Sequence, residues 1–428
     1  MINKSILLKY LPFSLLLITV NSHGQTLQLG STTFWWIVQL VVLIFFWVIK
    51  TKFTSNVHTN NLSILNFYIL YVIVQIVRAT FIAETYWDWK GLLSSSMSLL
   101  IPIVAFASNS KSLLKYIINY YVFITAPLFL IIQFFIGKDE YGFYLAPFSF
   151  LLLFLPVLTN KWKIILLIIA LYVIFADFGA RSNLIKFSIP IIFGFLYFFK
   201  NTITIKFLEI SRLIFMALPL VFLLLAVLGN FNIFNTKGEN KKGLIVKKKE
   251  FNGDIIEDDL TADTRTVLYI DVLNTAKKYN FWIFGRSPVR GYISEAFGDN
   301  DRNGRGERLG NEVSILNYFT WLGLVGVVLI FLLFYKASYL AINYSKNYFS
   351  KIIGLFISFR WSYAWVEDSN NFYIQYIYLW IFIGFCFSIN FRNMSDKELA
   401  QWVREIFFKK ISLKSNQFKI QLPKINAN

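Results

Sequence analysis

About twelve apolar runs, separated by short connections and one long polar segment, constrain the fold of this chain more than any other feature. Each run is close to the length that a helix needs to cross about 30 Å of hydrocarbon. Because backbone polar groups in lipid must be satisfied within their own segment, we expect each run to be a helix. The sequence therefore predicts an all-α protein that crosses a membrane many times. The runs cover residues 5–20, 33–49, 62–81, 91–107, 116–136, 142–159, 162–178, 183–199, 212–229, 313–335, 351–366 and 372–391.

Composition excludes several classes of protein. Of the 428 residues, 56% are hydrophobic and only 15% are charged, which leaves too little polar surface for a soluble globular protein. The net charge of +18 does not indicate nucleic-acid binding, because the cations concentrate in connections and in the tail, as the positive-inside rule requires. With one cysteine, Cys386, and two histidines, neither an intramolecular disulfide nor a histidine-rich metal site is expected. We expect no cofactor and no nucleic-acid partner.

The distribution of lysines predicts how the chain is threaded through the membrane. Lysines recur in alternate connections, such as 50–52, 111–115 and 336–351, and these connections are assigned to the cytoplasm. Both termini are then cytoplasmic and the long polar segment faces outward. The first run has a second interpretation, because residues 1–24 are also similar to a secretory signal; a retained helix is favoured.

Four regions follow from this organisation. They are membrane helices in 1–229, a large polar loop in 230–312, further membrane helices in 313–391 and a basic tail in 392–428. No internal repeat is visible, which counts against a transporter built from inverted halves.

The tail carries the pattern of an amphipathic helix. Ser395 and Glu398 have the spacing of a capping box. We expect the helix to lie on the cytoplasmic lipid surface and to anchor the tail there. The residues on its apolar face are Leu399, Trp402, Val403, Ile406 and Phe407.

Three arginines lie near the predicted outer ends of membrane helices. Arg181 falls in a tight turn, residues 176–183, between two runs. An arginine at bilayer depth costs several kcal/mol, so it usually lines a cavity or meets an anion. One interpretation is a clamp for phosphate, which suits the planar guanidinium; the other is a pair with Asp177 or a side chain that reaches the interface. Arg78 and Arg360 are candidates for the same polar pocket.

The polar loop adds further cations. Arg265 lies in a predicted helix, 261–273, capped by Thr261 or Asp263, and Arg286 and Arg290 follow it. Arg265 is either on a solvated face or in contact with an anion. Residues 299–304 match the first half of a calcium loop, but Gly310 stands where a glutamate ligand is required, so calcium is not expected.

Asn311 and Glu312 end the loop where the next apolar run begins. In the simpler interpretation Asn311 caps a helix and Glu312 is favoured by the positive helix end. In the other, Glu312 at the mouth of a membrane site accepts a proton from an attacking hydroxyl. Gly323 and Gly326 would permit close helix packing in either case.

Three stretches carry a resemblance to a known family: the turn around Arg181, the segment from Arg265 to Gly285, and Asn311-Glu312 followed by Gly323-Leu324-Val325-Gly326. Together they resemble the superfamily of O-antigen polymerases and O-antigen ligases. The resemblance implies a GT-C-like glycosyltransferase of the bacterial inner membrane, with its large loop in the periplasm. Donor and acceptor would be oligosaccharides linked to undecaprenyl pyrophosphate, and transfer would be metal-independent and inverting. Membrane lipids and a chain-length regulator protein are the other implied partners.

One departure separates the two branches of this superfamily. Ligases carry a histidine and a small polar residue ahead of the paired glycines, where this chain has Glu312 and Val313. We therefore favour a polymerase; a ligase that transfers glycan to lipid A-core, and a flippase for lipid-linked sugars, remain alternatives. Our hypothesis assigns the pyrophosphate to Arg181 and Arg265 and the role of base to Glu312. The candidate residues for substrate contact are Arg286, Arg290, Asn311, Arg78 and Arg360.

Overall fold

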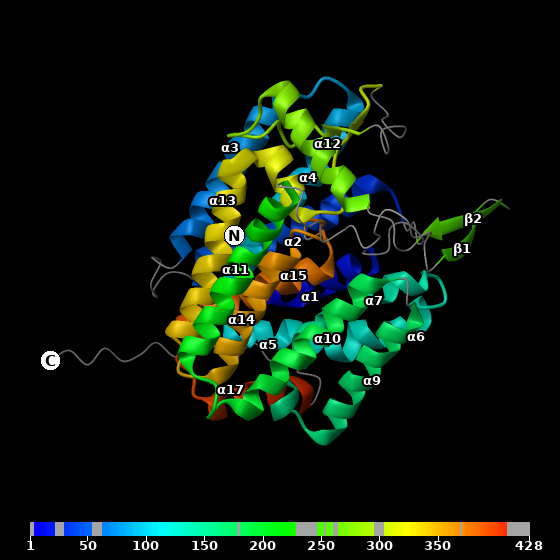
Figure 1. Cartoon of the computed structure of the whole chain (residues 1–428). Coiled ribbons are helices and arrows are strands. Elements are labelled where there is room, and N and C mark those ends of the chain that lie inside the picture. Colours follow the sequence, from blue (N-terminus) through cyan, green and yellow to red (C-terminus); the bar gives the residue numbers. More distant parts are fainter. Residues whose placement is uncertain are drawn as a thin grey trace.

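The computed structural model of the chain is mostly helical (Figure 1). It describes residues 4–21, 30–53, 62–177, 180–227, 246–251, 254–259, 264–294, 304–368 and 370–408. The α-helices are α1 Lys4–Asn21, α2 Thr32–Phe53, α3 Ser63–Thr80, α4 Tyr86–Leu100, α5 Lys111–Tyr120, α6 Phe129–Ile132, α7 Tyr141–Tyr144, α8 Ala146–Leu151, α9 Asn160–Ala176, α10 Arg181–Phe195, α11 Ile205–Val227, α12 Thr264–Tyr279, α13 Ser314–Asn343, α14 Tyr348–Tyr363, α15 Ile374–Phe387, α16 Ile389–Arg392 and α17 Asp396–Phe408. Segments of tighter or wider helix extend several of them, including Ile101–Asn109 after α4 and Leu152–Val157 after α8.

Among the residues that the structure describes, strands occur only in the polar loop. β1 Val246–Phe251 pairs antiparallel with β2 Asp254–Asp259, and β3 Tyr292–Ile293 pairs antiparallel with β4 Glu307–Arg308. Helix α12 confirms the helix predicted around Arg265. The expected caps Thr261 and Asp263, and residues 299–303 of the calcium pattern, lie outside the described residues.

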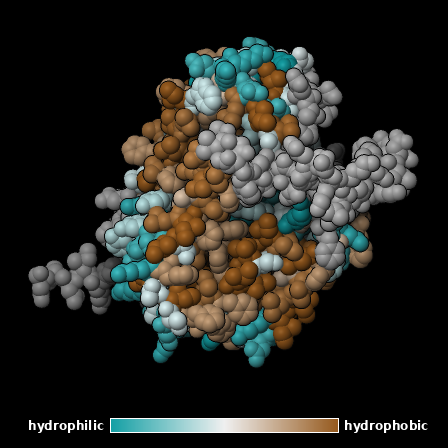
Figure 2. Space-filling model, viewed as in Figure 1, coloured by the Kyte–Doolittle hydropathy of each residue, from teal (hydrophilic) through white to brown (hydrophobic). Residues whose placement is uncertain are grey.

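Long apolar helices make this a membrane-embedded architecture. Within the described residues, 7 helices are long and apolar enough to cross a membrane, or 8 if a pair bent by 56° is one span. On the face in Figure 2, polar side chains gather at the top and along the bottom, and much of the surface between is hydrophobic. The 7 helical stretches are Thr32–Lys50, Ser63–Thr80, Tyr86–Asn109, Lys111–Ile132, Arg181–Phe199, Ile205–Leu225 and Ser314–Asn343; the bent pair is Lys138–Tyr144 with Ala146–Val157.

Helix α15 forms the centre of the bundle. All of its residues are buried, and it packs against α13, α14 and the helical segment Ile101–Asn109. A helix that is hydrophobic all round belongs inside a core, because no face suits water. The run 372–391 was predicted to be a membrane helix. It does form a helix, and that helix is buried among other helices of the protein.

A loop closes against a break in α13. Gly323 has φ +68° inside this helix, and Gly285, with φ +74°, lies directly against it. Leu324 N donates to Trp282 O at 2.8 Å and Arg286 N donates to Thr320 O at 2.7 Å, so the loop pairs with backbone groups at the break. Gly323 thus permits the close approach expected of it, but the partner is the loop backbone.

Helix α17 lies at the opposite end of the molecule from α12 (Figure 1). Its predicted capping box is confirmed: Ser395 N donates to Glu398 Oε2 at 2.7 Å and Glu398 N donates to Ser395 Oγ at 3.3 Å. The five residues of its apolar face are buried against the protein. Their burial corrects the expectation that this face lies on lipid; α17 contacts α5 and the segment Leu152–Val157.

Candidate functional site

Three cationic side chains from separate helices surround one carboxylate. Lys186 of α10 places Nζ 3.1 Å from Glu367 Oε1, and Arg265 of α12 places an amino nitrogen 3.8 Å from Glu367 Oε2. Arg360 of α14 interacts electrostatically with the same carboxylate. Glu367 itself lies in the segment that joins α14 to α15. These four residues define the Glu367 site.

Arg360 is the most unusual member of the Glu367 site. Its side chain is 7% exposed and contacts the ring of Tyr363 at 5.1 Å. Within the part of the chain that the structure describes, its Nε has no hydrogen-bond partner, and no ion pair includes its guanidinium. Burying an unpaired charge costs several kcal/mol, so a sequence tolerates it chiefly where a ligand compensates.

Lys186 is better satisfied. It is 5% exposed, donates to Ser182 Oγ at 3.4 Å and lies 4.6 Å from the ring of Phe143. Its position five residues into α10 puts its ammonium group inside an apolar helix end. Burial of this kind is sustained by the carboxylate at 3.1 Å, which offsets part of the desolvation cost.

Helix α12 holds the segment that carries Glu367. Arg265 Nε donates to Val366 O at 2.7 Å, and the Tyr269 hydroxyl donates to Trp365 O at 2.7 Å. Burial raises the pKa of Tyr269 above the ordinary tyrosine value, so this hydroxyl remains a neutral donor at physiological pH. The first backbone amides of α13 also donate hydrogen bonds to this segment, with Ser314 N at 3.2 Å from Glu367 O. Both sides of the segment are thereby fixed.

Arg181 lies near this cluster but outside it. It is exposed at the first turn of α10, and it has neither an ion pair nor a hydrogen bond to any residue described by the structure. Its neighbour Ser182 accepts a hydrogen bond through its carbonyl from the Tyr363 hydroxyl at 3.5 Å, which ties this turn to α14. Arg181 is therefore outside the Glu367 site, with its side chain exposed to solvent.

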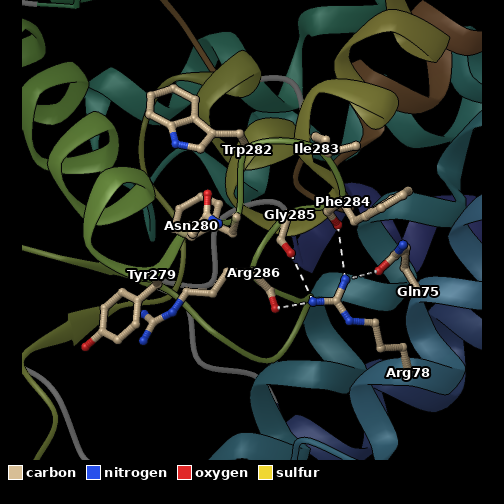
Figure 3. Close-up of a pocket in the computed structure, with 10 residues that line it drawn as sticks. Gln75, Arg78, Tyr279, Asn280, Trp282, Ile283, Phe284, Gly285 and Arg286 are labelled. Carbon is tan, nitrogen blue, oxygen red and sulfur yellow. Dashed lines mark hydrogen bonds between the residues drawn. The ribbon is translucent and has the colours of Figure 1, made fainter.

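Arg78 is not part of the Glu367 site. Its guanidinium donates to the carbonyls of Phe284 at 3.2 Å, Gly285 at 3.0 Å and Arg286 at 3.0 Å, and to Gln75 Oε1 at 2.9 Å (Figure 3). These bonds hold the 281–286 loop on the end of α3, beside a groove of about 650 Å³. The expectation that Arg78 shares one pocket with Arg181 and Arg360 is not met, because its donors are committed to this loop.

Replacing Arg78 with lysine should loosen the 281–286 loop. A lysine has a single ammonium group and cannot reach three carbonyls as the planar guanidinium does. We expect faster amide hydrogen exchange at residues 282–286 and a loss of about 2 kcal/mol of stability. Unchanged exchange would show that the glycine contact alone holds the loop.

The other loop arginines are also engaged in ion pairs. Arg286 is 2.7 Å from Glu307 and stacks on Tyr279, with its guanidinium carbon 3.9 Å from the ring centre. Arg290 is 3.3 Å from Glu84. Arg305 binds Asp88 at 2.9 Å, and this hydrogen bond raises the pKa of Arg305. The pairs of Arg290 and Arg305 therefore join the polar loop to the start of α4, whereas the pair of Arg286 lies within the loop.

Asn311 and Glu312 have separate environments. Asn311 is buried. Its backbone N donates to Asn317 Oδ1 at 2.8 Å, and Asn317 Nδ2 donates to Asn311 O at 2.9 Å. Helix α13 begins at Ser314, after Val313, so the prediction that Asn311 is its cap is wrong. Glu312 is 63% exposed and 3.7 Å from Arg308, on the surface of the loop. The role of base predicted for it stays a prediction.

Sequence reasoning missed Lys186, Tyr363 and Glu367. A signal was present for two of them: Lys186 interrupts an apolar run, and Glu367 with Asp368 forms an acidic pair between the apolar runs 351–366 and 372–391. Neither could be joined to the other without the fold. Within the described residues no group of three histidine, cysteine, aspartate or glutamate side chains is suited to a metal ion. The chemistry that the Glu367 site offers is recognition of an anion by fixed cations.

Comparisons with known proteins do not supply a family for the chain. No protein-family model matches it, and neither a curated protein nor a solved structure matches it.

Proposed function

We propose that the chain is a glycosyltransferase of the bacterial inner membrane that joins oligosaccharides carried on undecaprenyl pyrophosphate, as a surface-polysaccharide polymerase does. The observation that carries the proposal is Arg360, which is buried, has no ion pair among the described residues and an Nε without a hydrogen-bond partner there, and interacts electrostatically with Lys186 and Glu367. A pyrophosphate would supply the missing negative charge. The resemblance noted in the sequence agrees with this substrate class.

The charge balance of the Glu367 site favours an anionic ligand. Lys186, Arg265 and Arg360 carry three positive charges, against two negative charges on Glu367 and Asp368, which also interacts electrostatically with Lys186. Arg181, exposed at the start of α10, adds a fourth cation. Fixed cations in a low-dielectric site stabilise charge that develops on a leaving pyrophosphate, without the reorganisation that water would require.

The proposed orientation follows from the lysine distribution. The end of the molecule that carries α12 would face the periplasm, and the end with α17 the cytoplasm. With about twelve spans, the protein would present a GT-C-like arrangement, in which a large outer loop covers the site where lipid-linked substrates react. Both substrates would reach the site from the outer leaflet, since their chains remain in lipid.

Polymerase and ligase differ in the acceptor. A polymerase transfers the growing glycan to a new lipid-linked repeat unit, whereas a ligase transfers it to lipid A-core. The ligase histidine is absent at Glu312, and we therefore retain the polymerase as the proposal. Ligase and flippase activities are outcomes of the test.

The test is the surface glycan profile of a strain that lacks the protein, complemented with variants. Wild type should restore a ladder of long glycans, and Arg181→Ala and Arg265→Ala should reduce polymer formation about 100-fold or more, as loss of one anion-stabilising donor does. Arg404→Ala is the matched control. Arg404 also donates its Nε to a backbone carbonyl at 2.7 Å, that of Val157, but from α17.

Each outcome of this test separates the candidate functions. Single repeat units on lipid A-core in the deletion strain support the polymerase. Long glycan accumulated on the lipid carrier, with none on the core, identifies a ligase. Substrate retained on the cytoplasmic face identifies a flippase, and an unchanged profile overturns all three.

A further inference from the structure

In the structure, the anion among the three cations is the protein's own carboxylate. We propose that Glu367 occupies the pyrophosphate subsite while substrate is absent, is displaced by the incoming pyrophosphate, and then accepts the proton of the attacking hydroxyl. The inference rests on the proposed function and assigns a role within it.

The contacts of Glu367 are those of a stand-in for a phosphate oxygen pair. One carboxylate oxygen meets Lys186 Nζ at 3.1 Å, and the other faces Arg265 at 3.8 Å. The side chain is 16% exposed, so it is partly accessible from solvent and is not sealed within the core. A pyrophosphate presents more oxygens and at least two negative charges, and can therefore engage all three cations, including Arg360.

Displacement is favoured by the geometry. At 3.8 Å the contact of Glu367 with Arg265 is longer than a hydrogen bond, while Arg265 is held independently through its Nε on Val366 O at 2.7 Å. Arg265 therefore keeps its place when Glu367 leaves. Like charges repel, so a bound pyrophosphate drives the carboxylate away from the subsite.

A released Glu367 has the properties of a general base. In the structure one carboxylate oxygen is bound by Lys186 and the other faces Arg265, so neither is placed to meet a hydroxyl. Once phosphate takes these cations, the carboxylate is free to bind a hydroxyl. This order couples base activity to the presence of the donor substrate.

The proposed step is balanced in atoms and charge. The acceptor hydroxyl oxygen forms a bond to the anomeric carbon of the donor glycan. The bond from that carbon to the pyrophosphate oxygen breaks, and the electron pair leaves with undecaprenyl pyrophosphate. The hydroxyl proton passes to the Glu367 carboxylate and is later released to water.

The first experiment measures binding of inorganic pyrophosphate to the purified full-length protein by titration calorimetry. Glu367→Gln removes the competing charge and should tighten binding about tenfold, on the scale of one nearby like charge. In the same preparation, polymer formation from lipid-linked repeat units should fall about 100- to 10,000-fold, as expected for loss of a general base. Tighter binding with lost turnover is a combination that a merely structural role does not produce.

Two further variants keep the test decisive. Glu405→Gln is the matched control, because Glu405, on α17, also pairs with a lysine, Lys115. In this variant pyrophosphate binding and turnover should stay at wild-type values. Glu367→Asp keeps the carboxylate and should recover part of the turnover lost in Glu367→Gln. If Glu367→Gln does not fold, Glu367→Asp serves instead: tighter pyrophosphate binding with partial turnover is expected.

The possible failures are distinguishable. If Glu367→Gln binds pyrophosphate more weakly than wild type, or retains turnover, the role of Glu367 is overturned while the proposed function stands. If wild type binds pyrophosphate but forms no polymer, the proposed function fails. If wild type binds no pyrophosphate, the anion subsite itself is absent, and the inference fails with it.

Discussion

Replacing Arg360 with methionine should make the protein more stable and inactive. The side chain is 7% exposed and its guanidinium lacks an ion pair among the described residues, so its desolvation is offset only in part, by longer-range attraction to Glu367. Methionine fills a similar volume without charge, and we expect a gain of about 1–4 kcal/mol in the free energy of unfolding. Loss of one cation facing the pyrophosphate should lower polymer formation about 100- to 1,000-fold.

A matched control uses another buried arginine. Arg212 of α11 has no exposed side-chain surface, but it binds Glu209 at 2.6 Å. Arg212→Met leaves Glu209 without its partner and should lower stability. Unfolding of both variants in detergent checks the sign of each effect. If Arg360→Met destabilised the protein as Arg212→Met does, Arg360 would be structural and the site would lose its main support.

Adding one methyl group at Gly285 should have the largest effect on folding. A Cβ there would lie 2.5 Å from Gly323 N and 2.5 Å from Leu322 N, and the backbone has φ +74°. Neither neighbour can retreat, because both are backbone atoms at the break in α13. We expect Gly285→Ala to cost at least about 3 kcal/mol through strain and displacement of the loop.

Gly306→Ala separates the two causes. Gly306 has a similar φ of +66°, yet a Cβ there would meet nothing within 4 Å. Its cost should therefore be only that of the left-handed backbone, about 1 kcal/mol. Thermal unfolding of the two variants provides the comparison. Equal losses would contradict the close packing of the 281–286 loop on α13.

Local patterns in the sequence were sufficient for several elements. The apolar runs predicted a helical membrane protein, since lipid leaves the backbone few other choices. The spacing of Ser395 and Glu398 predicted the start of α17, because a capping box is closed within four residues. The helix around Arg265 was predicted from the pattern of its apolar residues, and it corresponds to α12.

The partners of these elements were not predictable from such patterns. The apolar face of α17 was expected on lipid and is buried against protein, because an amphipathic pattern is the same whichever apolar phase it meets. Asn311 was expected to cap α13, and it bonds instead to Asn317. Arg78 was expected to line a pocket, and its guanidinium instead donates hydrogen bonds that hold the 281–286 loop.

The chain order and hydropathy of this protein specify its membrane class, its long polar loop and the arginines near the helix ends, because these depend on neighbouring residues. Which cations meet depended on packing. Lys186, Arg265 and Arg360 come from three helices, and Glu367 from the connection beyond the last of them. Only the folding of α10, α12 and α14 around that connection brings the four charges together. The same packing leaves Arg360 buried with no ion pair to any described residue, and that is where the proposed substrate would bind.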